Sequence, residues 1–532
     1  MKVKSDKMKP LLSRLSQFLL GVCTIAFAGM MASCKDDDVK SEPSIPFDPS
    51  LPVTVTGFTP ESGGSQEEII VYGSNFGDKK ENVSLFIGEK KAVVINVMSD
   101  KLFAFIPAGA YSDSENYTGN VEVVVKNRGT EKSAVASKPF HYTPKKVVGT
   151  LCGYRNENDD QGEVWGPFDQ MCGFNAEGCL ALDPLYPDRL YVVYDRNDGI
   201  IACLDLKNRV AERMMSATKF QTKRLRNIAF TIDGKYMLVS TDRDDNGLHS
   251  TSVWVVTRNA DGTFSDRSSC QPLAAYKQCN GVAVHPVNGE IYFNSYENGQ
   301  LFRLDFDDYL KVLNGATDDN GEPLTWTGYR EDGAFRELYK IMDPSYEFQI
   351  TIHPSGDYAY ITVINRNYIL RTDYDWNKKE FTTPYVITGS NGIAGWTDAV
   401  GTNARVNRPY QGVFVKNPEY EADGRADVYD YYFSDCLNFC VRYITPDGLV
   451  RTYAGRSPST NGNIWGTEDG DLRQQARFRD VTGLCYDTER ERFYVLDHNN
   501  RSVRTIGMES SDMLNSNDND DNAGEDNETE NK

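Results

Sequence analysis

The feature that most constrains the fold is a pattern of four short strands that recurs along the chain. It is clearest in residues 448–506, where four runs rich in β-branched and aromatic residues alternate with Gly, Asp and Asn turns. Weaker versions precede it, which makes about six copies at a spacing of roughly 50 residues. One four-stranded sheet cannot bury both of its faces, so each copy needs neighbours of its own kind. This period is typical of the blades of a β-propeller.

The last two copies resemble the NHL repeat family. The residues that carry the resemblance are Tyr453-Ala-Gly455, Gly466, Asp469-Gly470, Ala476-Arg-Phe478, Gly483-Leu484, Phe493-Tyr-Val-Leu-Asp497 and Asn500-Arg-Ser-Val-Arg504. The resemblance implies a six-bladed propeller, which we assign to residues 145–508. Residues 146–150 have the pattern of an outermost strand, and residues 502–506 form a third strand without a fourth. We therefore expect the first strand of the propeller to complete its last blade, which would leave no exposed edge.

The first 33 residues have the pattern of an export signal. Basic residues precede an apolar run, Phe18 to Met31, of about 14 residues, which is too short for a typical membrane span. The run ends in Met-Ala-Ser-Cys34, which resembles the lipobox of bacterial lipoproteins, with Cys34 as the acylated first residue of the mature chain. The alternative is an ordinary cleaved signal with an incidental cysteine. Acidic residues 36–38 resemble the surface-export signal of Bacteroidetes lipoproteins.

Together these features predict a lipid-anchored protein exposed at the cell outer membrane. Residues 34–51 are expected to be an acidic, Pro-rich tether. At the other end, residues 509–532 are rich in Asn, Asp and Glu and predict a disordered acidic tail, with a calcium-binding tail as the alternative. The formal net charge of −20 argues against binding to nucleic acid, which depends on clustered Lys and Arg.

Residues 52–144 predict a separate domain. About 90 residues of short alternating strands indicate an immunoglobulin-like sandwich, so the whole chain is expected to be all-β. Phe58-Thr-Pro60, Gly64 and Gly73-Ser-Asn-Phe-Gly77 resemble the IPT/TIG family. These are turn and packing residues, so the resemblance implies a fold and no function. The domain is interpreted as a spacer, with ligand binding as the alternative.

Cysteine and histidine give few chemical leads. Nine cysteines remain after the signal and Cys34 are set aside, so at least one cannot pair within the chain. Two pairs are candidate disulfides if the protein is exported, Cys270 with Cys279 and Cys436 with Cys440. Apolar strand positions favour core roles for Cys203, Cys440 and Cys485. His285 and His353 each precede a proline and are interpreted as turn elements.

No catalytic or cofactor motif is evident. The sequence has no nucleophile elbow, zinc-protease helix or phosphate-binding loop. Residues 242–247 copy the first half of a calcium loop, but Val253 occupies the position where its last carboxylate belongs. We interpret the segment as a turn and expect no cofactor, with calcium as the alternative. A paired Asp/Glu glycosidase site is left open because carboxylates are abundant.

Four tryptophans are the candidate binding residues. They fall in equivalent segments of four copies, each after a predicted outermost strand and before the next inner strand. These residues are Trp165, Trp326, Trp396 and Trp465. A propeller places such connections on one face. Sugar rings stack their C–H patches on aromatic faces, and neighbouring Asp, Asn and Arg would bond the hydroxyls. The other interpretation is that these rings pack between blades.

Anchor, spacer and propeller together resemble Bacteroidetes TIG–NHL lipoproteins of polysaccharide-utilisation systems. The resemblance implies capture of an extracellular polysaccharide, without cleavage, beside a TonB-dependent transporter and its lid lipoprotein. Two alternatives remain open at this point. One is a lyase or hydrolase that uses carboxylates in the central mouth of the propeller. The other is a scaffold that docks onto another surface protein.

Overall fold

The computed structural model describes residues 45–65, 67–154, 163–194, 199–222, 224–242, 250–276, 278–296, 298–341, 347–458 and 462–509. These residues divide into two compact units, one mostly within residues 45–141 and the other from Tyr142 onward, to which residues 63–65 and 107–110 also belong. The predicted signal, Cys34 and all of the acidic tail after Glu509 lie outside the described residues. Within them, no helix combines the length and apolar character needed to cross a membrane.

The first unit contains two four-stranded antiparallel sheets, with strand orders β1-β3-β7-β6 and β10-β9-β4-β5. Every second side chain points inward, and Ile69, Leu85 and Val123 are fully buried. This alternation is the pattern of a sandwich in which each sheet has one buried and one solvent-exposed face. The strands are β1 (Thr54–Thr59), β2 (Ser62–Gly63), β3 (Glu68–Ser74), β4 (Val83–Ile87), β5 (Lys90–Lys91), β6 (Val93–Met98), β7 (Lys101–Phe105), β8 (Thr118–Gly119), β9 (Val121–Asn127), β10 (Thr130–Val135) and β11 (Phe140–Tyr142).

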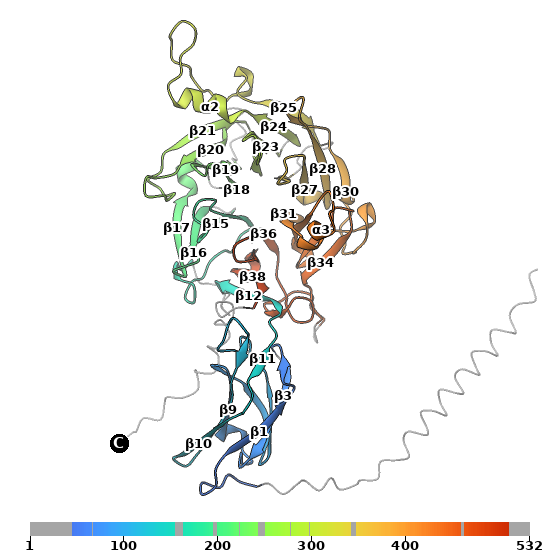
Figure 1. Ribbon diagram of the computed structural model, residues 1–532. Coiled ribbons are helices and arrows are strands. Elements are labelled where there is room, and N and C mark those ends of the chain that lie inside the picture. The colour runs from blue at the N-terminus through green and yellow to red at the C-terminus, as the bar shows by residue number, and fades with distance from the viewer. Residues whose placement is uncertain are drawn as a thin grey trace, which may run out of the picture. The chain divides into compact units, whose positions relative to one another are not determined.

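The second unit is a ring of six antiparallel sheets among the described residues, shown face-on in Figure 1. Blades 1 to 3 consist of β14 (Gly178–Leu182), β15 (Arg189–Tyr194), β16 (Ile200–Asp205) and β17 (Val210–Ser216); β18 (Leu225–Phe230), β19 (Tyr236–Thr241), β20 (Thr251–Thr257) and β21 (Cys270–Ala275); and β22 (Val282–Val284), β23 (Ile291–Ser295), β24 (Gln300–Leu304) and β25 (Arg336–Lys340). A short strand, β13 (Gly166–Pro167), pairs with β17.

Blades 4 to 6 consist of β26 (Phe348–Ile352), β27 (Tyr358–Val363), β28 (Tyr368–Asp375) and β30 (Tyr385–Gly389); β31 (Pro409–Lys416), β32 (Tyr429–Asp435), β33 (Cys440–Ile444) and β34 (Val450–Gly455); and β36 (Val481–Asp487), β37 (Arg492–Asp497), β38 (Ser502–Met508) and β12 (Lys146–Cys152). Short strands β29 (Glu380–Phe381) and β35 (Gly470–Asp471) extend blades 4 and 6. Two helices, α2 (Phe306–Leu313) and α3 (Pro418–Ala422), lie in connections.

The ring closes as the sequence predicts. β12, the first strand of the propeller, pairs antiparallel with β38, the last one, from Lys146 opposite Met508 to Cys152 opposite Val503. The prediction that the N-terminal strand completes the last blade is therefore confirmed. Because both ends of the unit share one sheet, β38 is not left as the edge strand of that sheet.

The apolar cores lie between consecutive blades. Middle strands such as β15 and β27 are buried along nearly their whole length, as expected for strands covered on both faces. The nine described cysteines are all free thiols, so neither candidate disulfide forms. Cys203, Cys440 and Cys485 are buried among apolar neighbours, which confirms their predicted core roles.

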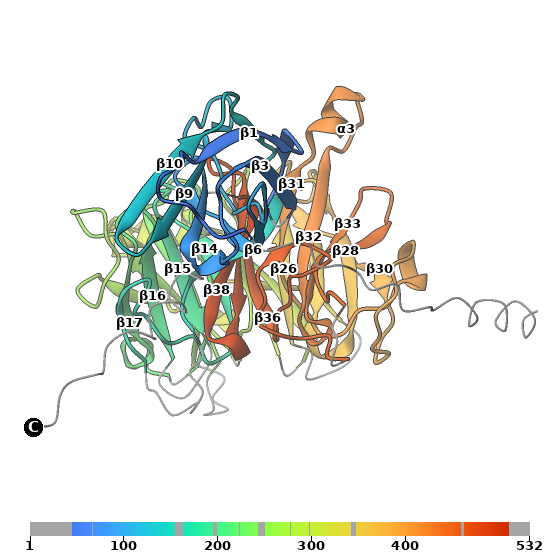
Figure 2. The ribbon, with the colours of Figure 1, turned by 90° about the horizontal axis from the view of Figure 1, so that it is seen from below.

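Each blade has the same direction, which defines two faces of the propeller. We call the face where every innermost strand begins the N face, and the opposite one the C face. Connections between blades, and those between the second and third strands, lie on the N face because successive strands are antiparallel. The first-to-second and third-to-fourth connections lie on the C face, where α3 projects beyond the strands (Figure 2).

Side-chain amides seal the innermost strands to one another. The Gln411 side chain accepts hydrogen bonds from the backbone N–H groups of Leu180 (2.8 Å) and Leu484 (3.0 Å), and donates to the Leu180 carbonyl (2.8 Å). Neighbouring innermost strands belong to different sheets, so they do not form a continuous series of backbone hydrogen bonds with one another. The amide therefore supplies the bonds that the backbone groups of β14 and β36 would otherwise lack.

Candidate functional site

A buried arginine fixes the loop that carries Trp396. Arg442 on β33 is fully buried, and its guanidinium donates to the carbonyls of Arg405 (2.6 Å) and Thr397 (2.8 Å). The same group bonds the carboxylates of Asp398 (2.8 Å) and Asp435 (2.9 Å). A planar fork with five donors can hold a loop and its anchors at once. The loop between β30 and β31 is therefore tied to its own blade from within.

Blade 6 repeats this device for the loop that carries Trp465. Arg504 on β38 donates to the carbonyls of Glu468 (3.0 Å) and Arg477 (3.1 Å), and pairs with Asp469 and with Asp497 (3.0 Å). Asn500 adds a bond to the Gly466 carbonyl (2.7 Å). These are residues that make the last two copies resemble NHL repeats. Their shared task is to hold the connection that reaches the N face.

Trp396 and Trp465 lie in equivalent positions and are partly exposed. The exposed fractions are 40% for Trp396 and 38% for Trp465. The indole N–H of Trp396 donates to the Thr452 hydroxyl at 3.0 Å, which fixes the ring plane. An arginine lies over each ring, Arg456 at 4.3 Å from Trp396 and Arg479 at 4.7 Å from Trp465. Each ring is thus held in place while part of its surface stays open to solvent.

Trp165 shares their position in the repeat but not their exposure. It follows β12 and precedes β14, so it belongs to a connection on the N face. Its ring is half-buried, meets Phe174 edge-on at 6.0 Å and packs against the core between blades 6 and 1. This is the packing role that the sequence left open as the other interpretation.

Trp326 is not equivalent to the other three, and this part of the prediction is wrong. It lies between β24 and β25, before the outermost strand of blade 3 rather than after it. The cause is a long insertion that contains α2 and delays the fourth strand. The indole N–H donates to the Leu273 carbonyl at 2.8 Å, and the ring meets Tyr309 edge-on. Trp326 thus packs an inserted segment onto blade 2.

Trp396 forms part of a pocket of about 630 Å³ on the N face. The pocket lies between the Trp396 loop and the connection from β34 to β36. Its wall combines an indole, an isoleucine, two guanidinium groups, two side-chain amides and one hydroxyl. The lining residues are Trp396, Arg456, Ser457, Pro458, Gly462, Asn463, Ile464, Arg473 and Gln474. Aromatic surface beside convergent hydrogen-bonding groups is the composition of a binding site for a small or chain-like polar ligand.

A second pocket, of about 270 Å³, lies at the mouth of the central axis on the same face. Its charged lining comes from the starts of the innermost strands and from second-to-third strand connections. The lining residues are Glu177, Arg224, Arg226, Asp242, Gln278, Asn280, Tyr296, Glu347 and Arg408. Three arginines face three carboxylates, so the formal charges of the lining balance.

The carboxylates of the central pocket are each held by arginine. Arg408 pairs with both oxygens of Glu177, one at 2.7 Å, and Arg226 contacts Glu347 and Asp242. Burial alone would raise the pKa of Glu177, but the hydrogen bonds and charge of Arg408 outweigh it, so the pKa lies below its usual value. A general acid needs the opposite shift, so Glu177 is poorly suited to protonate a leaving group.

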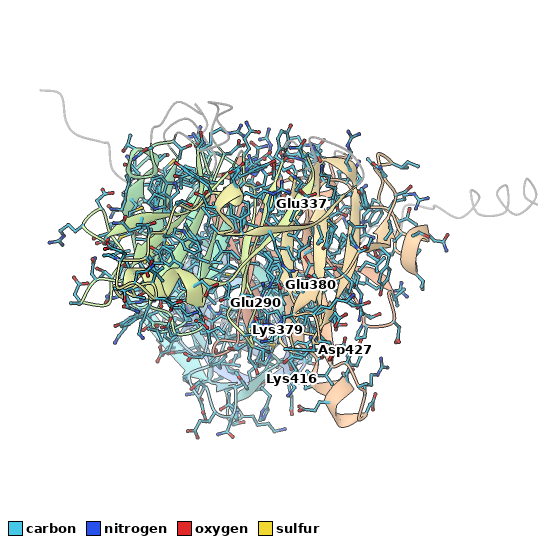
Figure 3. All side chains as sticks on the ribbon, turned by 90° about the horizontal axis from the view of Figure 1, so that it is seen from above. Glu290, Glu337, Lys379, Glu380, Lys416 and Asp427 are labelled. Atoms are coloured by element: carbon cyan, nitrogen blue, oxygen red, sulfur yellow. The ribbon has the colours of Figure 1, made fainter. Side chains whose placement is uncertain are left out.

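Acidic groups toward the C face serve the packing of the blades. Figure 3 shows Glu290 and Asp427 in the half of the propeller nearer α3. Glu290 accepts hydrogen bonds from Tyr292 (2.7 Å) and Tyr374 (2.9 Å) and pairs with Arg303. Asp427 accepts one from Tyr358 (2.7 Å). These bonds join strands within and between blades.

The predicted turn histidines belong to the C face as well. The Nδ1 atom of His285 accepts bonds from the N–H groups of Val287 and Asn288, both at 3.3 Å, and His353 does the same for Ser355 (3.1 Å). Both are therefore turn elements. Most of the segment that resembles half of a calcium loop lies outside the described residues. Within the described ranges, no group of three His, Cys, Asp or Glu side chains is placed to hold a metal.

Known proteins match this chain over most of its length. Residues 52–142 match the IPT/TIG domain family. A crystal structure described as an auxiliary nutrient binding protein from Bacteroides thetaiotaomicron is 35% identical, with a TM-score of 0.70, and the match covers 87% of this chain and 100% of that one. A second protein of that description, from Bacteroides ovatus, is 32% identical, with a TM-score of 0.62 and coverage of 88% and 100%.

The chain belongs to the family of these Bacteroides auxiliary nutrient binding proteins. A third structure, described as a candidate phosphatase from Bacteroides thetaiotaomicron, is 49% identical over 87% of this chain and 99% of that one, with a TM-score of 0.70. No curated protein matches the chain. The predicted all-β class, an IPT/TIG domain followed by a propeller, is confirmed.

For this member of the nutrient binding family, sequence patterns found part of the N-face surface. Trp396 and Trp465 stand out because tryptophan is rare. The central pocket was missed, although Glu177, Glu347 and Arg408 each directly precede an innermost strand and so share one repeat position. Arg456 and Arg473 were also missed, because they meet only through the path of the loop between β34 and β36.

Proposed function

We propose that this protein captures an extracellular polysaccharide on the N face of its propeller and does not cleave it. The observation that carries the proposal is the Trp396 pocket, in which a fixed, 40% exposed indole lies among amide, hydroxyl and guanidinium groups. A sugar ring buries its C–H patch on such a ring while its hydroxyls bond the polar rim. The description of two relatives as auxiliary nutrient binding proteins supports a role in nutrient uptake.

Calorimetry and pull-down against a panel of plant, host and microbial polysaccharides test this proposal. The protein would comprise residues 35–532, without the predicted signal and Cys34. Trp396→Ala is expected to weaken binding about tenfold or more, because stacking on one aromatic ring is lost. Trp376→Ala is the matched control, since Trp376 is 44% exposed on the C-face connection between β28 and β29. Equal losses from both variants would contradict the assignment of the face.

The same samples separate capture from catalysis. A lyase or hydrolase that works in the central pocket would release oligosaccharides or reducing ends during the incubation, and a phosphatase would release phosphate. The low pKa of Glu177 and the ion pairs of the other two carboxylates favour binding over acid catalysis there. Product release that disappears in Glu347→Gln would move the protein to the enzyme class. If no polysaccharide of the panel is bound or cleaved, the result would favour a scaffold that binds another surface protein.

We further propose that Cys34 is lipidated and holds the protein on the outer surface of the outer membrane, next to a TonB-dependent transporter and its lid lipoprotein. The lipobox-like sequence and the acidic residues after it support this location. Many anchored copies would add avidity to a modest affinity per site. Palmitate labelling that is lost in Cys34→Ser, together with protease sensitivity on intact cells, tests it. Unlabelled protein in the periplasm would contradict it.

A further inference from the structure

The arginines of the Trp396 pocket differ from most others in the propeller. Arg442, Arg504, Arg408 and Arg258 each pair with a carboxylate, as do Arg226, Arg303 and Arg477. In the part of the chain that the structure describes, Arg456 and Arg473 form no such pair. Arg456 donates to the Asn438 carbonyl (3.3 Å) and Arg473 to the Gly455 carbonyl. Both are half-buried, so each positive charge is partly desolvated without a counter-charge.

The acidic residues nearest in sequence are already engaged. Glu468 pairs with Arg477 at 2.8 Å, and Asp469 pairs with Arg504. Asp471 accepts hydrogen bonds from the backbone N–H groups at 473 and 474, both at 2.9 Å, and so caps its own turn. Among the nine residues that line the pocket there is no carboxylate. The positive charge in this wall is therefore not balanced from within the pocket.

The two guanidinium groups are close enough to oppose each other. Burial is the main cause that lowers the pKa of Arg456; the negative charge of Asp435 opposes this shift, while repulsion from Arg473 and Arg442 adds to it. A third arginine, Arg479, lies over Trp465 in the next loop position and also has no ion pair among the described residues. An anion placed between Arg456 and Arg473 would offset this repulsion and accept hydrogen bonds from the N–H groups of both guanidinium groups.

The whole protein argues against a general attraction to polyanions. Its formal net charge is −20, so an acidic polymer is repelled by most of the surface. Recognition of such a polymer must then be local, at a place where positive groups gather without counter-charges. The Trp396 pocket is such a place, and it also offers a sugar ring the part of the indole that Arg456 does not cover.

We propose that the pocket selects an acidic saccharide, with the carboxylate or sulfate of one sugar held by Arg456 and Arg473 while a neighbouring ring stacks on Trp396. This inference rests on the proposed capture of a polysaccharide and names its chemical class. Uronic acids and sulfated sugars share the chemistry that the site recognises, which is a planar or tetrahedral oxyanion on a pyranose ring. Guanidinium forks bind both geometries through paired N–H groups.

The test compares acidic polymers with their neutral counterparts. Residues 35–532 are titrated with polygalacturonate, alginate and a sulfated galactan that carries no uronic acid, and with the carboxyl-reduced forms of the first two and the desulfated form of the third, which keep the same linkages. We expect binding of at least one acidic polymer, a loss of about tenfold or more on neutralisation, and weaker binding as salt is raised from about 50 to 500 mM. A uronate and a sulfate polymer bound differently would tell the two sources of the anion apart.

Variants assign the effect to the pocket. Arg456→Gln with Arg473→Gln is expected to lower affinity for the acidic polymer about tenfold or more, since charge-assisted bonds are lost. Arg456→Lys with Arg473→Lys should retain part of it. Arg213→Gln is the control, because it removes one exposed arginine from β17 in blade 1. Melting curves of each variant show whether it is folded, and the wild-type comparison of acidic and neutral polymers stands without any variant.

The outcomes separate this inference from the function on which it rests. Equal binding of acidic and neutral forms, weakened by Trp396→Ala, would overturn the acidic class and leave capture intact. Acidic binding that survives the double Gln change would overturn the role of this pocket. No binding to any polymer would overturn both proposals.

Discussion

Replacement of Arg442 by Met should destabilise the propeller far more than replacement of an arginine at its rim. Arg442 is fully buried and makes four hydrogen bonds, two to carbonyls of the Trp396 loop and two to Asp398 and Asp435. Methionine fills similar volume but leaves the buried Asp435 carboxylate without its counter-charge. Removal of one partner from a buried pair costs about 3–5 kcal/mol, which for a propeller of this size corresponds to a fall in melting temperature of roughly 4–7 °C.

The matched control is Arg336→Met. Arg336 pairs with Glu380, but its side chain is 52% exposed, so its loss should cost less than about 1 kcal/mol. Urea unfolding followed by tryptophan fluorescence compares the two variants. The double variant Asp435→Asn with Arg442→Met should be more stable than the sum of the single changes predicts, because the orphaned charge is gone. An Arg442→Met protein no less stable than Arg336→Met would refute the account of how the loop is held.

Three further perturbations address closure, the axis and pH. Deletion of residues 145–150 removes most of β12 and should abolish the cooperative melting of the propeller in calorimetry; an unchanged transition would refute closure through β12. Gln411→Ala leaves backbone groups of Leu180 and Leu484 unsatisfied and should cost about 2–4 kcal/mol in urea unfolding, whereas a neutral effect would mean that the strands re-pair. Burial lowers the pKa of His285 below the usual 6.5, so the unfolded chain takes up a proton before the folded one does. Stability should therefore fall as pH drops below about 6.5. His285→Asn should make this pH slope shallower, and an unchanged slope would exclude His285 as its source.

The fold was predictable where the repeat is least disturbed. Blades 5 and 6 keep the residues that bind the connecting loop, Asp497, Asn500 and Arg504 in the last blade, and these bonds are local to one blade. Closure was predictable because a third strand without a fourth requires a partner. In blade 3 the same reasoning failed, because the insertion with α2 separates β24 from β25 and places Trp326 before the outermost strand.

The candidate site was predictable only in its aromatic part. A tryptophan next to a glycine in a loop can be recognised from the sequence alone. Trp396 and Trp465 lie in connections between blades, as that pattern predicts. The chemistry around them depends on which residues of a long loop fold back beside the ring. Arg456 and Arg473 are 17 positions apart in the chain and meet in one wall of the pocket. No periodicity of the repeat predicts such a meeting.

The two pockets of the N face show why charge balance is the informative property. In the central pocket each arginine faces a carboxylate, and such a network holds the starts of the innermost strands together without needing a ligand. In the Trp396 pocket the arginines have carbonyl oxygens as partners but no carboxylate among the described residues. The chain contains 77 acidic and 57 basic residues, so carboxylates are in excess. A wall that stays positive in such a chain is best explained by a counter-charge that arrives with the ligand, which is the reason for comparing acidic polymers with their neutral forms.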